Sequence, residues 1–220
     1  MKKIVHHLDE ATVLALAAGT LNDAHAIVAS AHMAMCPHCR ATLKNAEAIG
    51  GGLLSEEPGQ SVSQHLRSSV LAKLNDVAAA RAPKPRAELS AGELPAVLVR
   101  ALGQTSLDNI KWNRKLPGVA IYDVPLPKGT KTRLKLLSLD KGKAMPDHGH
   151  GGEELTLVLR GSYSDNMGRF AAGDVADLAE DVEHQPIVDS DENCICLISF
   201  DVPAKFKTIW ARLAQPFSGM

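Results

Sequence analysis

The chain has 220 residues, 45% of them hydrophobic and 22% charged, and its formal net charge at pH 7 is −1. This length has room for one medium domain or two small ones, and two are favoured. The near-zero net charge gives no electrostatic footprint for nucleic acid, so direct binding to DNA or RNA is not expected. No apolar run approaches about eighteen residues, and the N-terminus turns acidic before a signal-peptide core could form, which predicts a cytoplasmic protein without a membrane partner.

The first part of the chain is rich in Ala and Leu at helical spacing and predicts four helices. Asp9 is a good N-cap for the first helix, and Gly19 can take the left-handed conformation that ends it. Pro37 suits the first turn of the third helix, because that position needs no backbone N–H donor. The third helix is expected to stop at glycines 50–52. The expected ranges are 9–18, 23–35, 37 to the glycine run, and 63–79.

The fourth expected helix has an apolar stripe formed by Leu66, Val70, Leu74 and Val77, which recur at helical spacing. The simpler interpretation is that this face packs on the first three helices. The alternative is that the same face also grips a partner protein.

His32, Cys36 and Cys39 form a His-x3-Cys-x2-Cys pattern across the junction of the second and third helices. Positions i and i+4 share a helix face, so His32 lies above Cys36, and Cys39 returns to the same point one turn into the next helix. Tetrahedral structural zinc needs a fourth ligand, which His6 or His7 can offer. A zinc ion with two thiolates and two neutral imidazoles has no net charge and can be buried without a large desolvation cost. The pattern therefore predicts a structural Zn²⁺ site in a small helical unit.

The character of the sequence changes beyond the helical part. Residues 81–92 contain two prolines and scattered charge, which favour an extended, semi-rigid linker. Short alternating runs with Gly and Pro between them follow and predict strands, one of them over 132–140. We therefore expect a helical domain over 1–82, a linker over 83–95 and a β-rich domain over 96–220.

His148, His150 and Glu154 supply three metal-type ligands from seven residues. Alternate side chains of an extended segment project to one side, so the three can converge. Their spacing with the flanking glycines, Gly-x5-His-x-His-x3-Glu-x6-Gly, is similar to the first motif of the cupin superfamily, whose small β barrels bind a metal inside. His184 follows Gly173 in the place of the second cupin motif, at a longer spacing than usual, and is the expected fourth ligand.

The helical motif, with its upstream histidine, resembles the zinc-binding anti-sigma domain, a four-helix unit that clamps an extracytoplasmic-function (ECF) sigma factor. That domain joined to a C-terminal cupin is the architecture of the ChrR-type anti-sigma factors, and the similarity covers nearly the whole chain. It implies an α+β protein in two domains, a four-helix zinc-binding anti-sigma domain followed by an all-β cupin (double-stranded β-helix) barrel. It also implies that His7 ligates the zinc, with His6 as the alternative.

By the same resemblance the partner is an ECF sigma factor in a 1:1 heterodimer. The sigma factor would be released when the cupin senses oxidative stress, such as singlet oxygen or organic peroxide. The cupin ligands would accept Zn²⁺ or another divalent metal such as Mn, Fe or Ni.

A cupin metalloenzyme of dioxygenase type, with the zinc unit as an accessory, is the alternative to a regulator. The regulator is favoured because an oxygenase has no evident use for such a unit, and no catalytic residue is assigned. Cys194 and Cys196 are expected to be either buried reduced thiols or a redox-sensing pair, since a disulfide between positions two apart on a strand would be strained. His25, His38 and His65 have no partner at ligand spacing and are expected on the surface.

Overall fold

The helices of the computed structural model follow the sequence pattern closely. The structure describes residues 3–78, 94–149, 151–179, 182–202 and 205–206. The first four helices are α1 (Glu10–Ala17), α2 (Asp23–Met35), α3 (Pro37–Glu56) and α4 (Gln64–Ala78). Asp9 caps α1 by accepting the amide of Ala11, Gly19 follows with φ +68°, and Asn22 caps α2. The prediction of four helices in the N-terminal part is confirmed.

The end of α3 differs from the prediction, because the helix continues through glycines 50–52 to Glu56. Glycine ends a helix when it adopts a positive φ, and none of these three does so. In the right-handed conformation each weakens the helix by about 1 kcal/mol relative to alanine without ending it. Although α3 is 20 residues long, no helix within the described residues is long and apolar enough to cross a bilayer.

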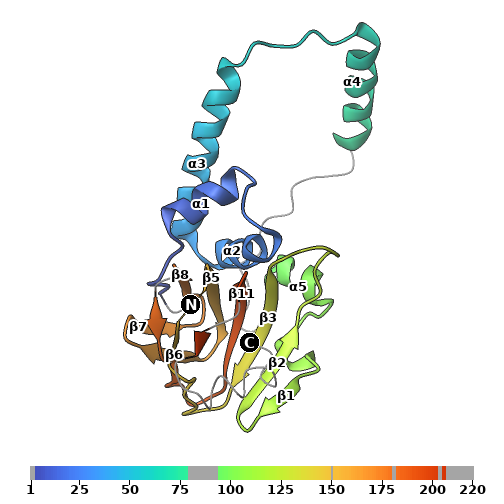
Figure 1. Ribbon diagram of the computed structural model, residues 1–220. Helices are drawn as coiled ribbons and strands as arrows, with labels where there is room; N and C mark the ends of the chain where they lie inside the picture. The colour runs from blue at the N-terminus through green and yellow to red at the C-terminus, as the bar shows by residue number, and fades with distance from the viewer. Residues whose placement is uncertain (1–2, 79–93, 150, 180–181, 203–204, 207–220) are drawn as a thin grey trace.

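Figure 1 shows the C-terminal part of α3 and the whole of α4 standing away from the rest of the molecule. The apolar stripe of α4 is open, with Leu66 51%, Val70 48% and Leu74 57% exposed. Val77 lies outside the described side chains. The expectation that this face packs on the first three helices is therefore wrong, and the face is available to a partner.

The remaining described residues form a β barrel that is entered through two short helical segments, α5 (Ala96–Leu102) and η1 (Leu107–Asn109). One sheet has the strand order β1-β2-β3-β11-β5-β8, and two smaller sheets have the orders β10-β6-β7 and β12-β4-β9. The strands are β1 (Asn113–Leu116), β2 (Val119–Asp123), β3 (Arg133–Leu139), β4 (His148–Gly149), β5 (Glu154–Arg160), β6 (Ser162–Asp165), β7 (Gly168–Ala171), β8 (Val175–Leu178), β9 (Glu183–His184), β10 (Ile187–Val188), β11 (Cys194–Phe200) and β12 (Lys205–Phe206). This is the predicted α+β order of helices followed by strands.

Strand β5 links the helical part to the inside of the barrel. Its outward side chains Leu155 and Leu157 belong to the same buried core as Val28 of α2, while Glu154 and Thr156 line a cavity inside the barrel. α2 lies across β5 and β11, so the helices and the barrel share one continuous core (Figure 1). Burial of apolar surface stabilises this contact by about 25 cal/mol per Å². The two parts are therefore held together by packing as well as by the chain between them.

Candidate metal centres

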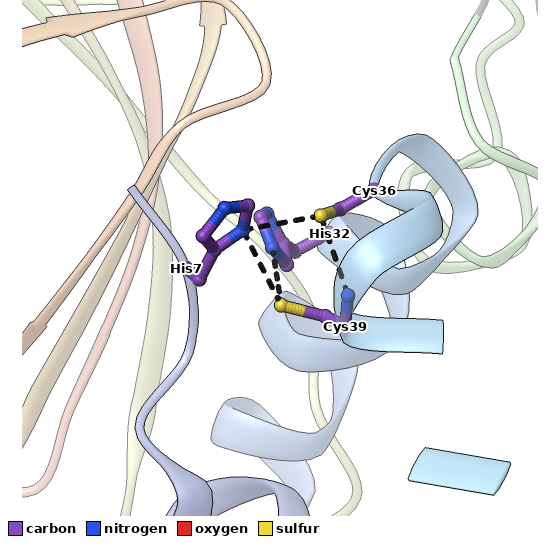
Figure 2. Close-up of side chains that lie close together, drawn as sticks. All are labelled: His7, His32, Cys36 and Cys39. Atoms are coloured by element: carbon purple, nitrogen blue, oxygen red, sulfur yellow. Dashed lines mark hydrogen bonds between the residues drawn. The ribbon is translucent and has the colours of Figure 1, made fainter. Parts of the chain in front are cut away.

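Four side chains from three segments of the helical part meet at one point. They are His7, His32, Cys36 and Cys39, and one ligand atom of each lies within 4.8 Å of all the others. Figure 2 shows the two thiols and the two imidazoles turned toward one another. The Nδ1 of His7 lies 3.3 Å from the Sγ of Cys36, and the Nε2 of His32 lies 3.2 Å from the Sγ of Cys39. A tetrahedral zinc ion with Zn–S of about 2.3 Å and Zn–N of about 2.0 Å would separate such atoms by roughly 3.5 Å.

The break between α2 and α3 produces this convergence. Cys36 ends α2 and begins α3, with φ −102° and ψ 109°, and the following Pro37 starts the new helix. The Sγ of Cys36 accepts the amide of Cys39 at 3.5 Å, while the Cys36 amide donates to the carbonyl of His32 at 2.8 Å. The spacing of the motif therefore brings three ligands together, as the sequence predicted.

The structure also separates the two neighbouring histidines at the N-terminus. The Nδ1 of His7 is 3.7 Å from the Sγ of Cys39 as well as close to Cys36, so this ring completes the cluster. The ring of His6 points the other way, onto the barrel, where its Nε2 donates to the carbonyl of Arg169 at 3.1 Å. His7, and not His6, therefore lies among the thiols.

Burial controls the protonation of this cluster. Desolvation lowers the pKa of His32 to about 4, so its imidazole is neutral at pH 7. Because the Nδ1–H of His32 donates to the carbonyl of Gly173 at 3.0 Å, the lone pair of this neutral ring lies on Nε2, which faces Cys39. Burial raises the pKa of the Cys39 thiol to about 11, with the neighbouring Cys36 adding to the shift. A metal that bound here would have to displace the thiol protons, and its charge would make up for that cost.

A second group of candidate ligands lies inside the barrel. His148 on β4 and His184 on β9 occupy paired positions, both are buried, and their ring centroids are 4.7 Å apart. With the buried Glu154 they line a cavity of about 60 Å³. His150, the remaining expected ligand, lies outside the described residues. The structure therefore brings together three of the four side chains that the sequence singled out.

Hydrogen bonds hold these barrel side chains in place. The Nδ1–H of His148 donates to the carbonyl of Pro146 at 2.9 Å, and the Nδ1 of His184 lies 2.9 Å from a carboxylate oxygen of Asp165. Thr156 donates its hydroxyl to Glu154 at 2.9 Å. Imidazoles that ligate a metal through Nε2 typically have such a hydrogen bond from Nδ1 to a carbonyl or carboxylate oxygen.

The wall of the cavity includes residues that the sequence analysis missed. Lys135 and Tyr163 line it, and Lys135 forms an ion pair with Asp123. The strand alternation that directs Leu137 inward also directs Lys135 inward, so the signal was present in the pattern of β3. Desolvation raises the pKa of the Tyr163 hydroxyl, which keeps it neutral.

The two cysteines of β11 are buried, and two of the three remaining histidines are exposed. Cys194 and Cys196 are both buried with their sulfur atoms 3.7 Å apart, and both are free thiols. Cys196 lines the cavity, and its pKa is raised by the hydrogen bond with Cys194 and by burial.

His38 and His65 are exposed, as expected. The expectation for His25 is wrong. This residue is only 2% exposed, because it lies on the face of α2 that packs on the barrel.

The chain has the architecture of a cupin-type protein with an N-terminal helical unit. The helical unit brings two thiols and two imidazoles to one point, and it packs on a barrel that has histidines and a glutamate inside. The sequence model of the family described as ChrR cupin-like domain matches residues 102–201. The curated protein "Anti-sigma-E factor ChrR" of Cereibacter sphaeroides is 38% identical over 214 residues, which is 97% of this chain and 98% of that protein. The chain belongs to the ChrR family of anti-sigma factors.

A solved structure supports the same assignment. The crystal structure of Rhodobacter sphaeroides SigE in complex with the anti-sigma ChrR matches this chain with a TM-score of 0.76 and 35% sequence identity. The match covers 90% of this chain and 100% of the matched chain. It extends over both the helical part and the barrel, so the cupin fold class is confirmed, and the chain falls among regulators rather than cupin enzymes.

Proposed function

We propose that this chain sequesters an ECF sigma factor in a 1:1 heterodimer and releases it in response to oxidative stress. The observation that carries the proposal is the open apolar surface of the helical part. It comprises the end of α3 and one face of α4, namely Ile49, Leu53, Leu54, Leu66, Val70, Leu71 and Leu74, each about half exposed or more. The relative in the matched crystal structure is in complex with SigE, a sigma factor.

This surface, which we call the clamp surface, has the properties of a protein-binding face. Short helices gain most of their stability from packing of an amphipathic face, yet the described apolar side chains of α4 stay about half exposed among the residues that the structure describes. An amphipathic helix that lays its apolar side into a partner's groove is a recurrent mode of recognition. A partner that covered both helices would remove these side chains from water.

For the helical cluster we infer structural Zn²⁺ held by His7, His32, Cys36 and Cys39. Two thiolates and two neutral imidazoles are a donor set that tetrahedral zinc prefers. The short ligand-to-ligand distances and the burial of three of the four residues support the inference. This zinc would fix α1, α2 and the start of α3 to one another and so present the clamp surface.

For the barrel we infer a divalent metal, Zn²⁺ or Mn, Fe or Ni, held by His148, His150, Glu154 and His184. The convergence of the three described residues on one buried cavity supports this inference. Loss or oxidation of such a site is the proposed route by which the barrel senses stress. The proposed division of the chain is a zinc domain over 1–82, a linker over 83–95 and a cupin domain over 96–220, acting in the cytoplasm.

The clamp surface can be tested by changing α4 alone. Val70→Glu with Leu74→Glu places two charges on the apolar face, whereas Ser68→Glu adds a charge on the opposite, exposed side of the same helix. Each variant is coexpressed with an ECF sigma factor that the unmodified chain retains, and the complex is purified through a tag on one chain. The double variant is expected to lose the sigma factor, since unpaired charge cannot be buried at low cost, and Ser68→Glu to keep it. Retention of the sigma factor by the double variant would refute the role of this face.

A further inference from the structure

The segment that carries His7 is fastened to the barrel on both sides of this residue. The amides of Val5 and His6 donate to one oxygen of Asp174 at 2.7 and 3.0 Å. The amide of Asp9 donates to Asp177 at 3.0 Å. Both carboxylates belong to the barrel, at the start of β8 and within it. The position of His7 is therefore set by barrel residues before it and after it in the chain.

Asp174 is built into the barrel at this point. It is 2% exposed, and its second oxygen accepts the amide of Ala171 at 2.9 Å, which closes the turn between β7 and β8. One buried carboxylate thus joins the turn of the barrel to the N-terminal segment. A buried carboxylate that accepts three amides is costly to remove, because each amide would lose a charge-assisted partner.

The adjacent Gly173 reaches the other imidazole of the cluster. Its carbonyl accepts the Nδ1–H of His32 at 3.0 Å. Gly173 has φ +100°, and a Cβ at this position would lie 2.8 Å from the side chain of Ile4, so a larger residue would push the N-terminal segment away. The same turn of the barrel thus contacts the ring of His32 directly and bonds the backbone of the two residues that precede His7.

A row of rings leads from this segment to the cavity of the barrel. The ring of His6 stacks on Phe170 with centroids 4.0 Å apart, and Phe170 stacks on Tyr163 at 5.1 Å. Tyr163 lines the cavity together with Glu154. A change in the shape of the cavity wall can therefore reach the segment next to His7 through packed side chains.

We propose that the β7–β8 turn, residues 171–174, holds the histidine ligands of the helical zinc site in position through hydrogen bonds, with Asp174 as the positioning residue. Outer hydrogen bonds orient ligands, and their loss typically lowers metal affinity by about 10- to 100-fold. The affinity for zinc in the helices thus depends on the conformation of the barrel, and by reciprocity bound zinc stabilises the contact between them. This inference rests on the proposed zinc site and requires no sigma factor.

The test uses Co²⁺ titration of the metal-free full-length chain. Thiolate-to-cobalt charge transfer reports the cysteine-containing site, and the proposed barrel ligands include no thiolate. Asp174→Asn is expected to raise the dissociation constant for Co²⁺ roughly tenfold, and the more exposed Asp177→Ala, which removes the bond to Asp9, roughly threefold. The intensity of the charge-transfer band per bound Co²⁺ should be the same as in the unmodified chain, because all four ligands remain. Near-UV circular dichroism, which reports tertiary packing around aromatic side chains, confirms that each variant folds.

Two control variants make the test specific. Asp189→Asn breaks a carboxylate network with Ser162, Ser164 and Arg169 in the same barrel and should change the affinity less than about twofold. His6→Phe keeps a ring on Phe170 but has no ligating nitrogen, so it should bind Co²⁺ with nearly unchanged affinity. If it lost affinity as strongly as His7→Ala, His6 would be a ligand and the proposed arrangement would be wrong.

A measurement on the unmodified chain covers the case in which Asp174→Asn does not fold. Removal of zinc should speed hydrogen exchange at the amides of Val5 and His6, which donate to Asp174, more than at the amides of β3. Equal exchange with and without zinc, or unchanged Co²⁺ affinity in folded Asp174→Asn, would overturn the inference. Absence of any thiolate-to-cobalt band in the unmodified chain would instead refute the zinc site itself.

Discussion

His148 and His184 face each other across the antiparallel pair β4 and β9, with ring centroids 4.7 Å apart. They come from the two separate cupin-like motifs of the sequence, so the fold, and not the local spacing, creates their contact. Both rings line the same cavity as Glu154.

The first prediction concerns this barrel site. His148→Ala or Glu154→Ala should lose the barrel metal and blunt induction by singlet oxygen or peroxide several-fold, because a ligand is removed. Repression in unstressed cells should persist, since the clamp surface is unchanged. Metal content by atomic emission and a sigma-dependent reporter measure the two effects, with the exposed His65→Ala as the control. Normal induction in a variant that lacks the barrel metal would place the sensor elsewhere, with Cys194 and Cys196 the next candidates.

The second prediction concerns the helical site. Cys36→Ser or Cys39→Ser should lose one zinc per chain and fail to hold the sigma factor, which leaves its target promoters active without stress. The reason is that zinc-binding energies of about 10–16 kcal/mol act as folding energy in small domains of this kind. Cys194→Ser removes a buried thiol of the barrel and should keep the helical zinc. A Cys36→Ser chain that still represses fully would contradict this assignment.

The third prediction is a loss of stability in acid. The pKa of His32 is lowered from 6.5 to about 4 by burial, so below pH 6.5 the unfolded chain takes up a proton that the folded chain does not. The free energy of unfolding should therefore fall by about 2 kcal/mol from this residue between about pH 7.5 and pH 5. Urea unfolding of the metal-free chain at the two pH values measures the change. His32→Gln should have a smaller pH dependence, and an equal one would show that other groups control it.

The fourth prediction separates the two parts of the molecule. A fragment of residues 1–85 contains the clamp surface and all four helical ligands, so it should bind the sigma factor and not respond to the inducer. Because α2 packs on the barrel, the fragment exposes part of its core and should need zinc to fold. Pull-down and circular dichroism with and without zinc measure both properties. A fragment that folds with zinc but does not bind the sigma factor would assign part of the partner surface to the barrel.

Local sequence signals predicted most of this architecture. Caps such as Asp9 and the His-x3-Cys-x2-Cys spacing act within a few residues, so they can be recognised without knowing the fold. The inward direction of Glu154 followed from strand alternation in the same way. These features depend on neighbours in the chain.

The features that were missed depend on contacts between distant segments. The helical stripe of Leu66 and Val70 is the same whether the face packs internally or stays open, so periodicity could not decide between the two. The burial of His25 results from the barrel surface that covers α2. Nor could spacing reveal that Asp174 supports the segment around His7, since these residues meet only in the folded chain.

The uninterrupted helix through glycines 50–52 has a thermodynamic consequence for capture of a partner. Three glycines together weaken the end of α3 by about 3 kcal/mol relative to alanines, just where Leu53 and Leu54 are exposed. Part of the binding free energy must then be used to hold this turn of helix in place. If a partner covers Leu53 and Leu54 as proposed, replacing the glycine run with alanines would make a captured partner slower to leave.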